Sequence, residues 1–309
     1  MPVVYETSLQ KSKDRERKIL SVVGYEGTLL DLTLKEEEGG IPICRIAAHA
    51  FENRTDLRRA ILPKSISCLG PFSFYGCTSL FLLDLYNTTV DIGDGVIRQC
   101  PGLCRIVVRC IQEGEYQTAK DLLRDVEREL TFHFMTKEGE IRLTFPDYVN
   151  EAREDTMARA IHFSIEGAGV AYRECVGRHA LDLTGYDRLF DHLTDYDSSC
   201  AVKIAMGRLA CPMALSMRAK SQYEEYLRSH DEKTLMVILN GTKSAIPEEQ
   251  KDWEEYFSLF LHRSLLGKEA LEKGLELASS LGQRKECSAL LDYRSKTFPE
   301  KEECFSLDW

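Results

Sequence analysis

The sequence predicts an α+β protein in which a short β-solenoid is followed by a β-hairpin and then by a mostly α-helical domain. Three observations support this fold class. A 23-residue unit repeats in the first part of the chain, alternating apolar residues flank the turn TKEGE, and apolar residues recur at helical spacing beyond Leu181. These patterns divide the chain into an N-terminal segment (1–19), a solenoid (20–110), an α/β connecting region (111–180) and an α-helical domain (181–309).

The repeat is visible in two matching stretches, AHAFENRTDL from Ala48 and PFSFYGCTSL from Pro71. Five apolar columns keep this register over three units, and such a fixed period is typical of stacked repeats. The columns are Ile46/Leu69/Ile92, Phe51/Phe74/Ile97, Leu57/Leu80/Leu103, Ala60/Leu83/Ile106 and Leu62/Leu85/Val108.

Each unit also contains one short segment with strand-like alternation, seen as LRRAIL, LFLLDL and LCRIVV. Alternation with a period of two residues predicts a strand with one face directed inward. Stacked units would align these strands into a parallel sheet. Pro63, Gly70, Gly76 and Gly93 interrupt the rest of each unit, where the chain must turn back for the next coil.

These units resemble the BspA-like leucine-rich repeats of bacteria, whose pattern runs approximately IG..AF..C..L..I.LP..V. The matching stretches are IAAHAFENRTDLRRAILPKSI, LGPFSFYGCTSLFLLDLYNTTV and IGDGVIRQCPGLCRIVV. The resemblance covers roughly residues 20–110 and implies a leucine-rich-repeat solenoid. The chain departs from the pattern at Asn53-Arg54, where a cysteine is usual, and in lacking an export signal, although many relatives are surface proteins.

The connecting region is predicted to contain a hairpin and two helices. LTFHFM and IRLTF flank the turn TKEGE, with Leu130, Phe132 and Phe134 on one side of the first strand. Apolar residues at helical spacing predict a helix from Glu115, and PDYVNEAREDTMARA predicts a second helix that begins near Pro146.

Beyond Leu181 the chain is predicted to be helical almost throughout. Short helices joined by short polar loops suggest stacked antiparallel pairs, and Trp253, Tyr256 and Phe257 are expected in the core. The last pair, ALEKGLELASSLGQRKECSALLDYRSK, breaks at Gly282 and resembles an ankyrin unit, although it lacks the Thr-Pro-Leu-His start. We describe this region as helical-repeat or ankyrin-like.

Composition excludes several classes of partner. The net charge of −10 disfavours nucleic acid, and no apolar stretch approaches the eighteen or so residues needed to span a bilayer. The first residues, MPVVYETSLQKSKDRERKIL, lack the apolar core of a secretory signal, so we expect a cytoplasmic protein without membrane contact. Eleven cysteines, an odd number, indicate free thiols.

No motif predicts a metal or another cofactor. Cys100, Cys104 and Cys110 do not follow the Cys-x-x-Cys spacing of a zinc site, and no nearby histidine completes four ligands. Cys77 and Cys100 share one repeat column, so the fold alone accounts for them. We expect these cysteines to be structural.

Catalytic motifs are also missing from the sequence. IEGAG lacks the third glycine of a dinucleotide-binding turn, and His162 and Glu166 lack the second histidine of a helical zinc signature. There is no Gly-x-Ser-x-Gly. We therefore do not expect an enzyme.

The outward face of the predicted strands is the candidate binding surface. If the repeat columns point inward, the alternating residues form three outward rows: Arg59/Leu82/Arg105, Ile61/Asp84/Val107 and Pro63/Tyr86/Arg109. Apolar residues beside arginines are typical of interface cores. The predicted partner-binding residues are Arg59, Ile61, Leu82, Asp84, Tyr86, Arg105, Val107 and Arg109.

The function that follows is a non-enzymatic protein–protein interaction module that presents a concave solenoid face to a protein or peptide. One alternative is an enzyme or small-molecule sensor whose pocket lies between the two domains, with His133, His162 and Glu166 converging on it. Another is a structural protein without a ligand. In a further alternative the helical domain covers the strand face. The sequence does not indicate the oligomeric state.

Overall fold

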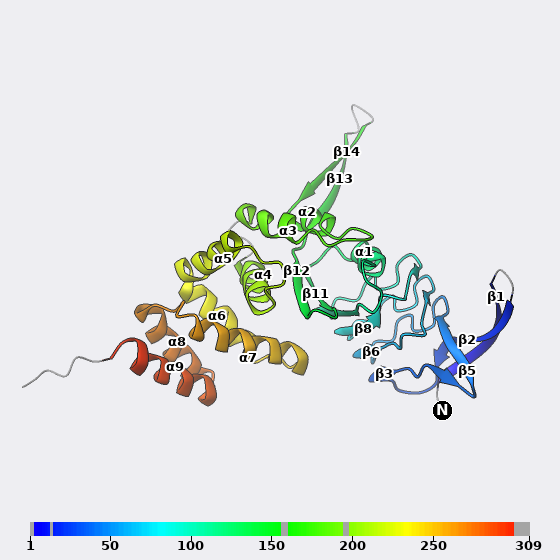
Figure 1. Ribbon diagram of the computed structural model, residues 1–309, viewed down its shortest axis with the longest axis horizontal. Helices are drawn as coiled ribbons and strands as arrows, with labels where there is room; N and C mark the ends of the chain where they lie inside the picture. Colours follow the sequence, from blue (N-terminus) through cyan, green and yellow to red (C-terminus); the bar gives the residue numbers. More distant parts are fainter. Residues whose placement is uncertain (1–2, 13–14, 156–159, 194–197, 300–309) are drawn as a thin grey trace, which may run out of the picture. The chain divides into compact units, whose positions relative to one another are not determined.

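The computed structural model describes residues 3–12, 15–155, 160–193 and 198–299 (Figure 1). The chain forms two compact units. Unit 1 comprises Met1–Cys200 and Cys211–Leu215, and unit 2 comprises Ala201–Ala210 and Ser216–Trp309.

Unit 1 is built on two sheets whose central strands are parallel. Sheet A contains, in spatial order, β1 (Val3–Ser12), β2 (Arg15–Tyr25), β5 (Ile41–Ile46), β7 (Cys68–Leu69) and β9 (Asp91–Ile92), with β4 (Glu37–Glu38) beside β5. Sheet B contains β12 (Glu140–Phe145), β11 (Leu130–Met135), β10 (Arg105–Arg109), β8 (Leu82–Tyr86), β6 (Arg59–Ile61) and β3 (Asp31–Thr33). The chain passes from one sheet to the other in each coil, which is the architecture of a solenoid.

The predicted repeat register is confirmed in sheet B. Ala60 lies opposite Leu83, and Leu83 lies opposite Ile106, so neighbouring strands are offset by one full repeat. These three side chains are fully buried. The other apolar columns are buried too, apart from Ile92, which is half-buried. Unit 1 is therefore a leucine-rich-repeat type solenoid.

The outer turns of the solenoid repeat their backbone conformation as well as their sequence. Left-handed residues, with φ between 55° and 69°, recur in two columns that follow the period of the repeat. Glycine occupies only some of these positions, and at two of the others the His49 and Phe72 rings stack between coils with their centroids 5.4 Å apart. The columns are His49/Phe72/Gly95 and Asn53/Gly76/Gln99.

Two further glycines allow successive coils to approach closely. A Cβ atom on Gly70 would lie 2.4 Å from the Ala48 nitrogen, and one on Gly93 would lie 2.4 Å from the Pro71 nitrogen. Both contacts are with backbone atoms, which cannot move aside without disturbing the coil. Glycine is therefore required at these two positions of the repeat.

The predicted hairpin is confirmed, and it extends the solenoid sheet. β11 pairs in parallel with β10, and β12 then pairs antiparallel with β11. Leu130, Phe132 and Phe134 are buried as predicted. The predicted helix that precedes them is α1 (Gln117–Leu123). The change of strand direction at β12 ends the parallel stack.

The helix predicted to begin near Pro146 is wrong. The described part of this segment forms β13 (Val149–Asp155), which pairs antiparallel with β14 (Ala160–Glu166). Residues 156–159 of the predicted helix lie outside the described residues. The four residues EARE, from Glu151, have good helix propensity, but the alternating segment AIHFSIE lies close enough in sequence to supply a partner strand. Strand pairing with a neighbouring segment outweighs local preference here.

The helices predicted after Leu181 are confirmed. The first of them are α3 (Leu183–Arg188) and the 3-10 helix η1 (Leu189–His192). α2 (Gly169–Glu174) precedes them, in a segment for which the sequence predicts no element. The remaining helices are α4 (Ser198–Ala210), α5 (Met217–Ser229), α6 (Asp231–Gly241), α7 (Pro247–His262), α8 (Lys268–Ser280) and α9 (Arg284–Thr297).

Within unit 2, α6 packs against both α7 and α8, and α8 packs against α9. Trp253, Tyr256 and Phe257 are buried, as expected for core residues of α7. Gly282 takes a left-handed conformation (φ 71°) at the break between the last two helices. Among the described residues, no helix combines the length and apolar character needed to cross a bilayer.

Candidate functional site

The candidate site is the outward face of sheet B, which we call the strand face. Its strands align the predicted rows: Arg59 lies opposite Leu82, and Leu82 lies opposite Arg105. The second and third rows keep the same register. They comprise Ile61/Asp84/Val107 and Tyr86/Arg109, and the hairpin continues all three rows with Thr131/Thr144, His133/Arg142 and Met135/Glu140.

Solvent exposure on this face differs from the sequence prediction at two positions. Leu82 and Asp84 retain only 6% of their exposure, although we expected both to be exposed. They lie on β8, between the side chains of β6 and β10 that share their rows: Arg59 and Arg105 beside Leu82, and Ile61 and Val107 beside Asp84. The remaining predicted residues are half-buried: Arg59, Ile61, Tyr86, Arg105, Val107 and Arg109.

Two of the predicted arginines are paired with carboxylates on the same face. Arg109 donates two hydrogen bonds to Asp84, from Nε to Oδ1 (2.8 Å) and from Nη2 to Oδ2 (2.7 Å). Arg59 makes the same bidentate arrangement with Asp31, at 2.7 and 2.9 Å. The hydrogen bond from Arg59 lowers the pKa of Asp31, and the hydrogen bond to Asp84 raises the pKa of Arg109. The strand face is therefore more nearly neutral than the sequence suggested.

A polar cluster lies at the hairpin end of the strand face. Nδ1 of His133 lies 2.6 Å from Oε1 of Glu140, and the same carboxylate oxygen accepts two hydrogen bonds from Arg142, each 3.1 Å long. His133 and Arg142 are buried. The hydrogen bond with His133, supported by the charge of Arg142, lowers the pKa of Glu140 to about 2. Glu140 is therefore ionised at neutral pH.

The residues predicted to converge in the alternative pocket lie on different sheets. His133 belongs to the Glu140 cluster on β11. Glu166 is exposed at the end of β14, in a separate two-stranded sheet. The backbone of His162 pairs with Arg153 in that sheet, and its side chain lies outside the described residues.

Cys77 and Cys100 have the structural role that their shared column predicts. The Sγ of Cys77 donates to the Phe51 carbonyl and that of Cys100 to the Phe74 carbonyl, each at 3.1 Å. Hydrogen bonding with Cys100, together with burial, raises the pKa of Cys77. In the part of the chain that the structure describes, no group of three or more His, Cys, Asp or Glu residues is arranged to hold a metal ion.

The departure from the repeat pattern at Arg54 now has a physical explanation. Arg54 occupies the column position of Cys77 and Cys100, one repeat before Cys77. Its guanidinium donates to the carbonyls of Tyr25 (3.2 Å) and Gly27 (2.6 Å) in the preceding turn. An arginine reaches these more irregularly placed carbonyls, whereas a cysteine suffices between regular coils.

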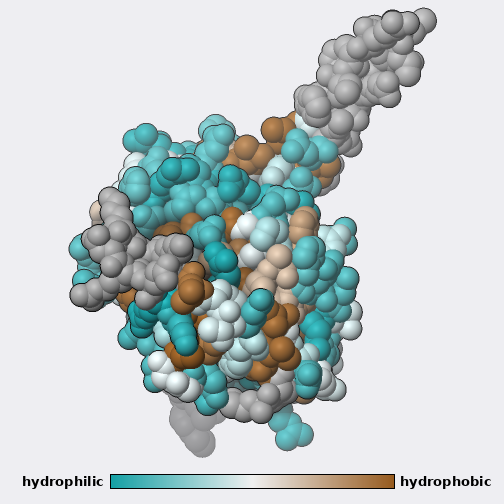
Figure 2. Space-filling view, turned by 90° about the vertical axis from the view of Figure 1, so that its right-hand side faces the viewer, coloured by the Kyte–Doolittle hydropathy of each residue, from teal (hydrophilic) through white to brown (hydrophobic). Residues whose placement is uncertain are grey.

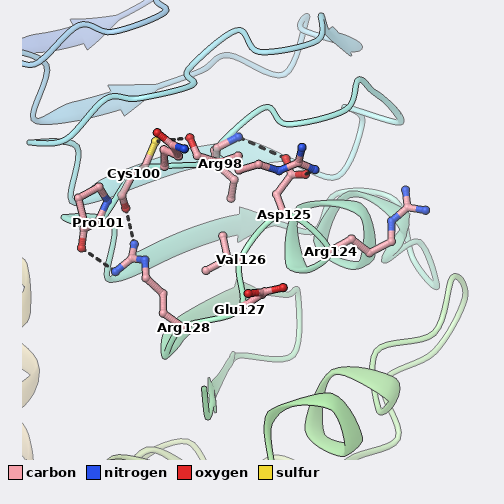
Figure 3. Close-up of a pocket in the computed structure, with 10 residues that line it drawn as sticks. Arg98, Cys100, Pro101, Arg124, Asp125, Val126, Glu127 and Arg128 are labelled. Carbon is pink, nitrogen blue, oxygen red and sulfur yellow. Dashed lines mark hydrogen bonds and ion pairs between the residues drawn. The ribbon is translucent and has the colours of Figure 1, made fainter. Parts of the chain in front are cut away.

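A groove of about 530 Å³ lies at the other end of the array, where the third unit meets the segment after α1 (Figure 3). Asp125 accepts hydrogen bonds there from the Gly95 and Ile97 amides, at 3.2 and 3.3 Å. In earlier coils the equivalent amides donate to the next coil, as Phe74 does to the Val96 carbonyl. The Asp125 carboxylate therefore replaces the missing coil.

Arg128 performs the complementary task in the same groove. Its guanidinium donates to the carbonyls of Cys100 (2.5 Å) and Pro101 (2.7 Å), as Figure 3 shows, and also to that of Leu103. Sequence analysis missed both Asp125 and Arg128. No repeat column could have indicated them, because they follow the last unit.

Proteins similar to part of this chain are found among solved structures. No family model matches the chain, and no curated protein matches it. Among solved structures, it is similar to a leucine-rich cell-surface protein from Faecalibacterium prausnitzii (20% identity, TM-score 0.27). It is also similar to leucine-rich-repeat proteins from T. pallidum (23%, 0.25) and Bacteroides ovatus (11%, 0.20).

These similarities are partial on both sides. The matches cover 34%, 35% and 35% of this chain, and 31%, 62% and 49% of the respective structures, so the chain spans less than two thirds of each. The assignment of unit 1 therefore rests on the strand register of its own repeat. By that criterion, the chain combines a leucine-rich-repeat type solenoid with a helical unit.

Proposed function

We propose that this protein is a non-enzymatic interaction module that binds a protein or peptide on the strand face, the concave side of the solenoid. The observation that carries the proposal is the alignment of half-buried Ile61, Tyr86 and Val107 with Arg59 and Arg105 on one continuous sheet. Aromatic, aliphatic and arginine side chains held in a rigid array are the composition of an interface core.

The ion pairs on the strand face refine the expected partner. Four arginines face three carboxylates there, a balance of +1 in a chain whose net charge is −10. The partner should therefore present an apolar centre with a modest acidic rim rather than a strongly acidic surface. The charges are Arg59, Arg105, Arg109, Arg142, Asp31, Asp84 and Glu140.

The proposed function can be tested by substituting Ile61 and Val107, two apolar residues that lie in one row of the strand face. Ile61→Asp/Val107→Asp places two carboxylates on the face, whereas the control Val90→Asp/Ile111→Asp makes the same change at exposed apolar residues outside it. Proteins captured from a cell extract by the wild type would be identified by mass spectrometry. The best candidate would then be purified and its binding measured by calorimetry.

We expect the strand-face variant to lose at least about tenfold in affinity, because two contacts in the interface core are removed. The control should bind as the wild type does, and both variants should keep a folded circular dichroism spectrum. Equal binding by both variants, with the strand-face variant folded, would contradict the proposal.

We further propose that the protein is cytoplasmic and that its last helix pair is an ankyrin-like repeat unit. Ten free cysteines among the described residues are compatible with a reducing compartment. α8 and α9 form an antiparallel pair whose turn at Gly282 has the form expected of a helical repeat. Proteolysis in intact and fractionated cells would test the location.

A further inference from the structure

A second surface, remote from the strand face, lies on the N-terminal hairpin. β1 pairs with β2 along its whole length and is the last strand of sheet A on that side (Figure 1). Within the described residues, no other strand pairs with its outer edge. β1 is ten residues long and contains no proline. Long unprotected edge strands are templates for pairing with another chain.

The register of the hairpin shows which backbone groups point outward. Ser12 pairs with Arg15, and two residues separate them. In a two-residue hairpin the flanking residues exchange hydrogen bonds, and bonded pairs then alternate along the ladder. Glu6 and Ser8 therefore use their amides and carbonyls to bind β2. Those of Tyr5, Thr7 and Leu9 point away from it.

Exposed apolar side chains accompany these outward backbone groups. Leu9 is 58% exposed and Val4 is 37% exposed. Figure 2 views the molecule from the right-hand side of Figure 1, and its described surface mixes hydrophobic and hydrophilic residues. Natural edge strands are commonly short or carry several charges, whereas the segment from Val3 to Leu9 has only Glu6.

We propose that β1 pairs antiparallel with β1 of a second copy of this chain, with Thr7 opposite Thr7 of the second copy on a twofold axis. The same edge is then used by both copies, as a twofold interface requires. This register places Tyr5 opposite Leu9 of the second copy, twice. The pairing joins two copies of sheet A into one continuous sheet.

Neighbouring registers are less favourable on physical grounds. Only residues with outward backbone groups can exchange hydrogen bonds with the second copy. The register can therefore shift only in steps that leave Tyr5, Thr7 and Leu9 opposite one another or opposite Lys11. One shift places Tyr5 opposite Thr7 of the second copy. Glu6 then lies opposite Glu6 of the second copy, in a pair that is not hydrogen-bonded, and like charges directly opposite are destabilising. The other places Leu9 opposite Thr7 and leaves Tyr5 opposite Lys11. The central register alone pairs the aromatic residue with the exposed leucine.

The dimer can be tested by light scattering coupled to size exclusion over a concentration series. Thr7→Pro removes an outward amide without removing a hydrogen bond to β2, so the variant should stay folded and become monomeric. Leu9→Lys should weaken dimerisation about tenfold or more, because it removes two apolar contacts. Val90→Lys, at an apolar residue exposed elsewhere, is the matched control and should dimerise like the wild type.

Hydrogen exchange provides a second readout that does not depend on the variants folding. In the wild type, the amides of Thr7 and Leu9 should become protected as concentration rises, whereas the Ser8 amide should be protected throughout. A wild-type protein that is monomeric at every concentration would overturn the proposal. So would a dimer in which Thr7 and Leu9 exchange freely.

Discussion

Individual side chains complete the hydrogen bonding at the two ends of the solenoid. Arg54 binds carbonyls of the turn before the first unit, and Asp125 and Arg128 bind amides and carbonyls of the third unit. Buried backbone groups without a partner are costly, so these residues contribute more to stability than ordinary surface charges do. They are the side chains that a regular repeat does not need.

Replacing Asp125 should reveal the value of this capping. Asp125→Ala leaves the Gly95 and Ile97 amides without their acceptor and should lower the free energy of unfolding by about 1–3 kcal/mol. Asp94→Ala is the matched control, because Asp94 also pairs with Arg98 but is largely exposed. This substitution should lower the free energy of unfolding by less than about 0.5 kcal/mol. Chemical unfolding monitored by fluorescence would measure both. Equal losses would show that Asp125 acts only as a surface charge.

Glu140 should make stability depend on acid pH. Because its pKa is lowered from 4.5 to about 2 in the folded protein, its contribution is present above pH 4.5 and is lost as the pH falls toward 2. Glu140→Gln removes this contribution and should flatten the dependence of the urea midpoint on pH within that window. The variant should differ most from the wild type near neutral pH. If the difference in urea midpoint between the wild type and Glu140→Gln stayed constant from pH 5 to pH 2, this assignment would be contradicted.

None of the residues that bind the ends of the array could be predicted from the repeat. The hydrogen bonds of Asp125 connect it to residues 28 and 30 positions earlier, outside the period of the repeat. Likewise, the pairing of Arg109 with Asp84 became visible only once the strands were in register. Spacing predicts which columns are buried, but it does not predict which charges meet.

Each strand of the solenoid presents one face to the core and one to the strand face, and the two faces should respond differently to substitution. Inward columns were predicted correctly because a strict two-residue period determines them. Exposure on the outward face was predicted wrongly at Leu82 and Asp84, because alternation gives the direction of a side chain but not how closely the side chains of the neighbouring strands lie beside it. The wrong helix prediction for the segment that begins near Pro146 has a related cause, since pairing between two segments decides that structure.

Leu80 and Leu82 provide the comparison. Leu80→Asp places an unpaired carboxylate in the core of the second unit and should cost on the order of 3 kcal/mol or more, enough to unfold or aggregate the solenoid. Leu82→Asp should destabilise less, because Arg59 and Arg105 lie on either side of it and can compensate the charge. Thermal unfolding would rank the variants. A greater loss for Leu82→Asp would reverse the assignment of the two faces.

The molecule as a whole combines a solenoid unit and a helical unit, and cysteines are distributed over both. All ten cysteines that the structure describes are free. We expect thiol titration of the denatured protein to give close to the full eleven without prior reduction. In the native protein, Cys77 and Cys100 should react slowly, because they are buried and hydrogen-bonded. A denatured count that is lower by an even number, and restored by reductant, would indicate disulfides.

The difference between the ends and the middle of the array determines how a protein of this kind can change its length. A duplicate unit inserted between the second and third units would find a row of amides on one side and a row of carbonyls on the other. A unit added after the third would have to displace Asp125 and Arg128 and to break the pairing of β10 with β11. Growth by tandem duplication is therefore open only to the interior of the array, and both ends keep their sequence whatever the number of repeats.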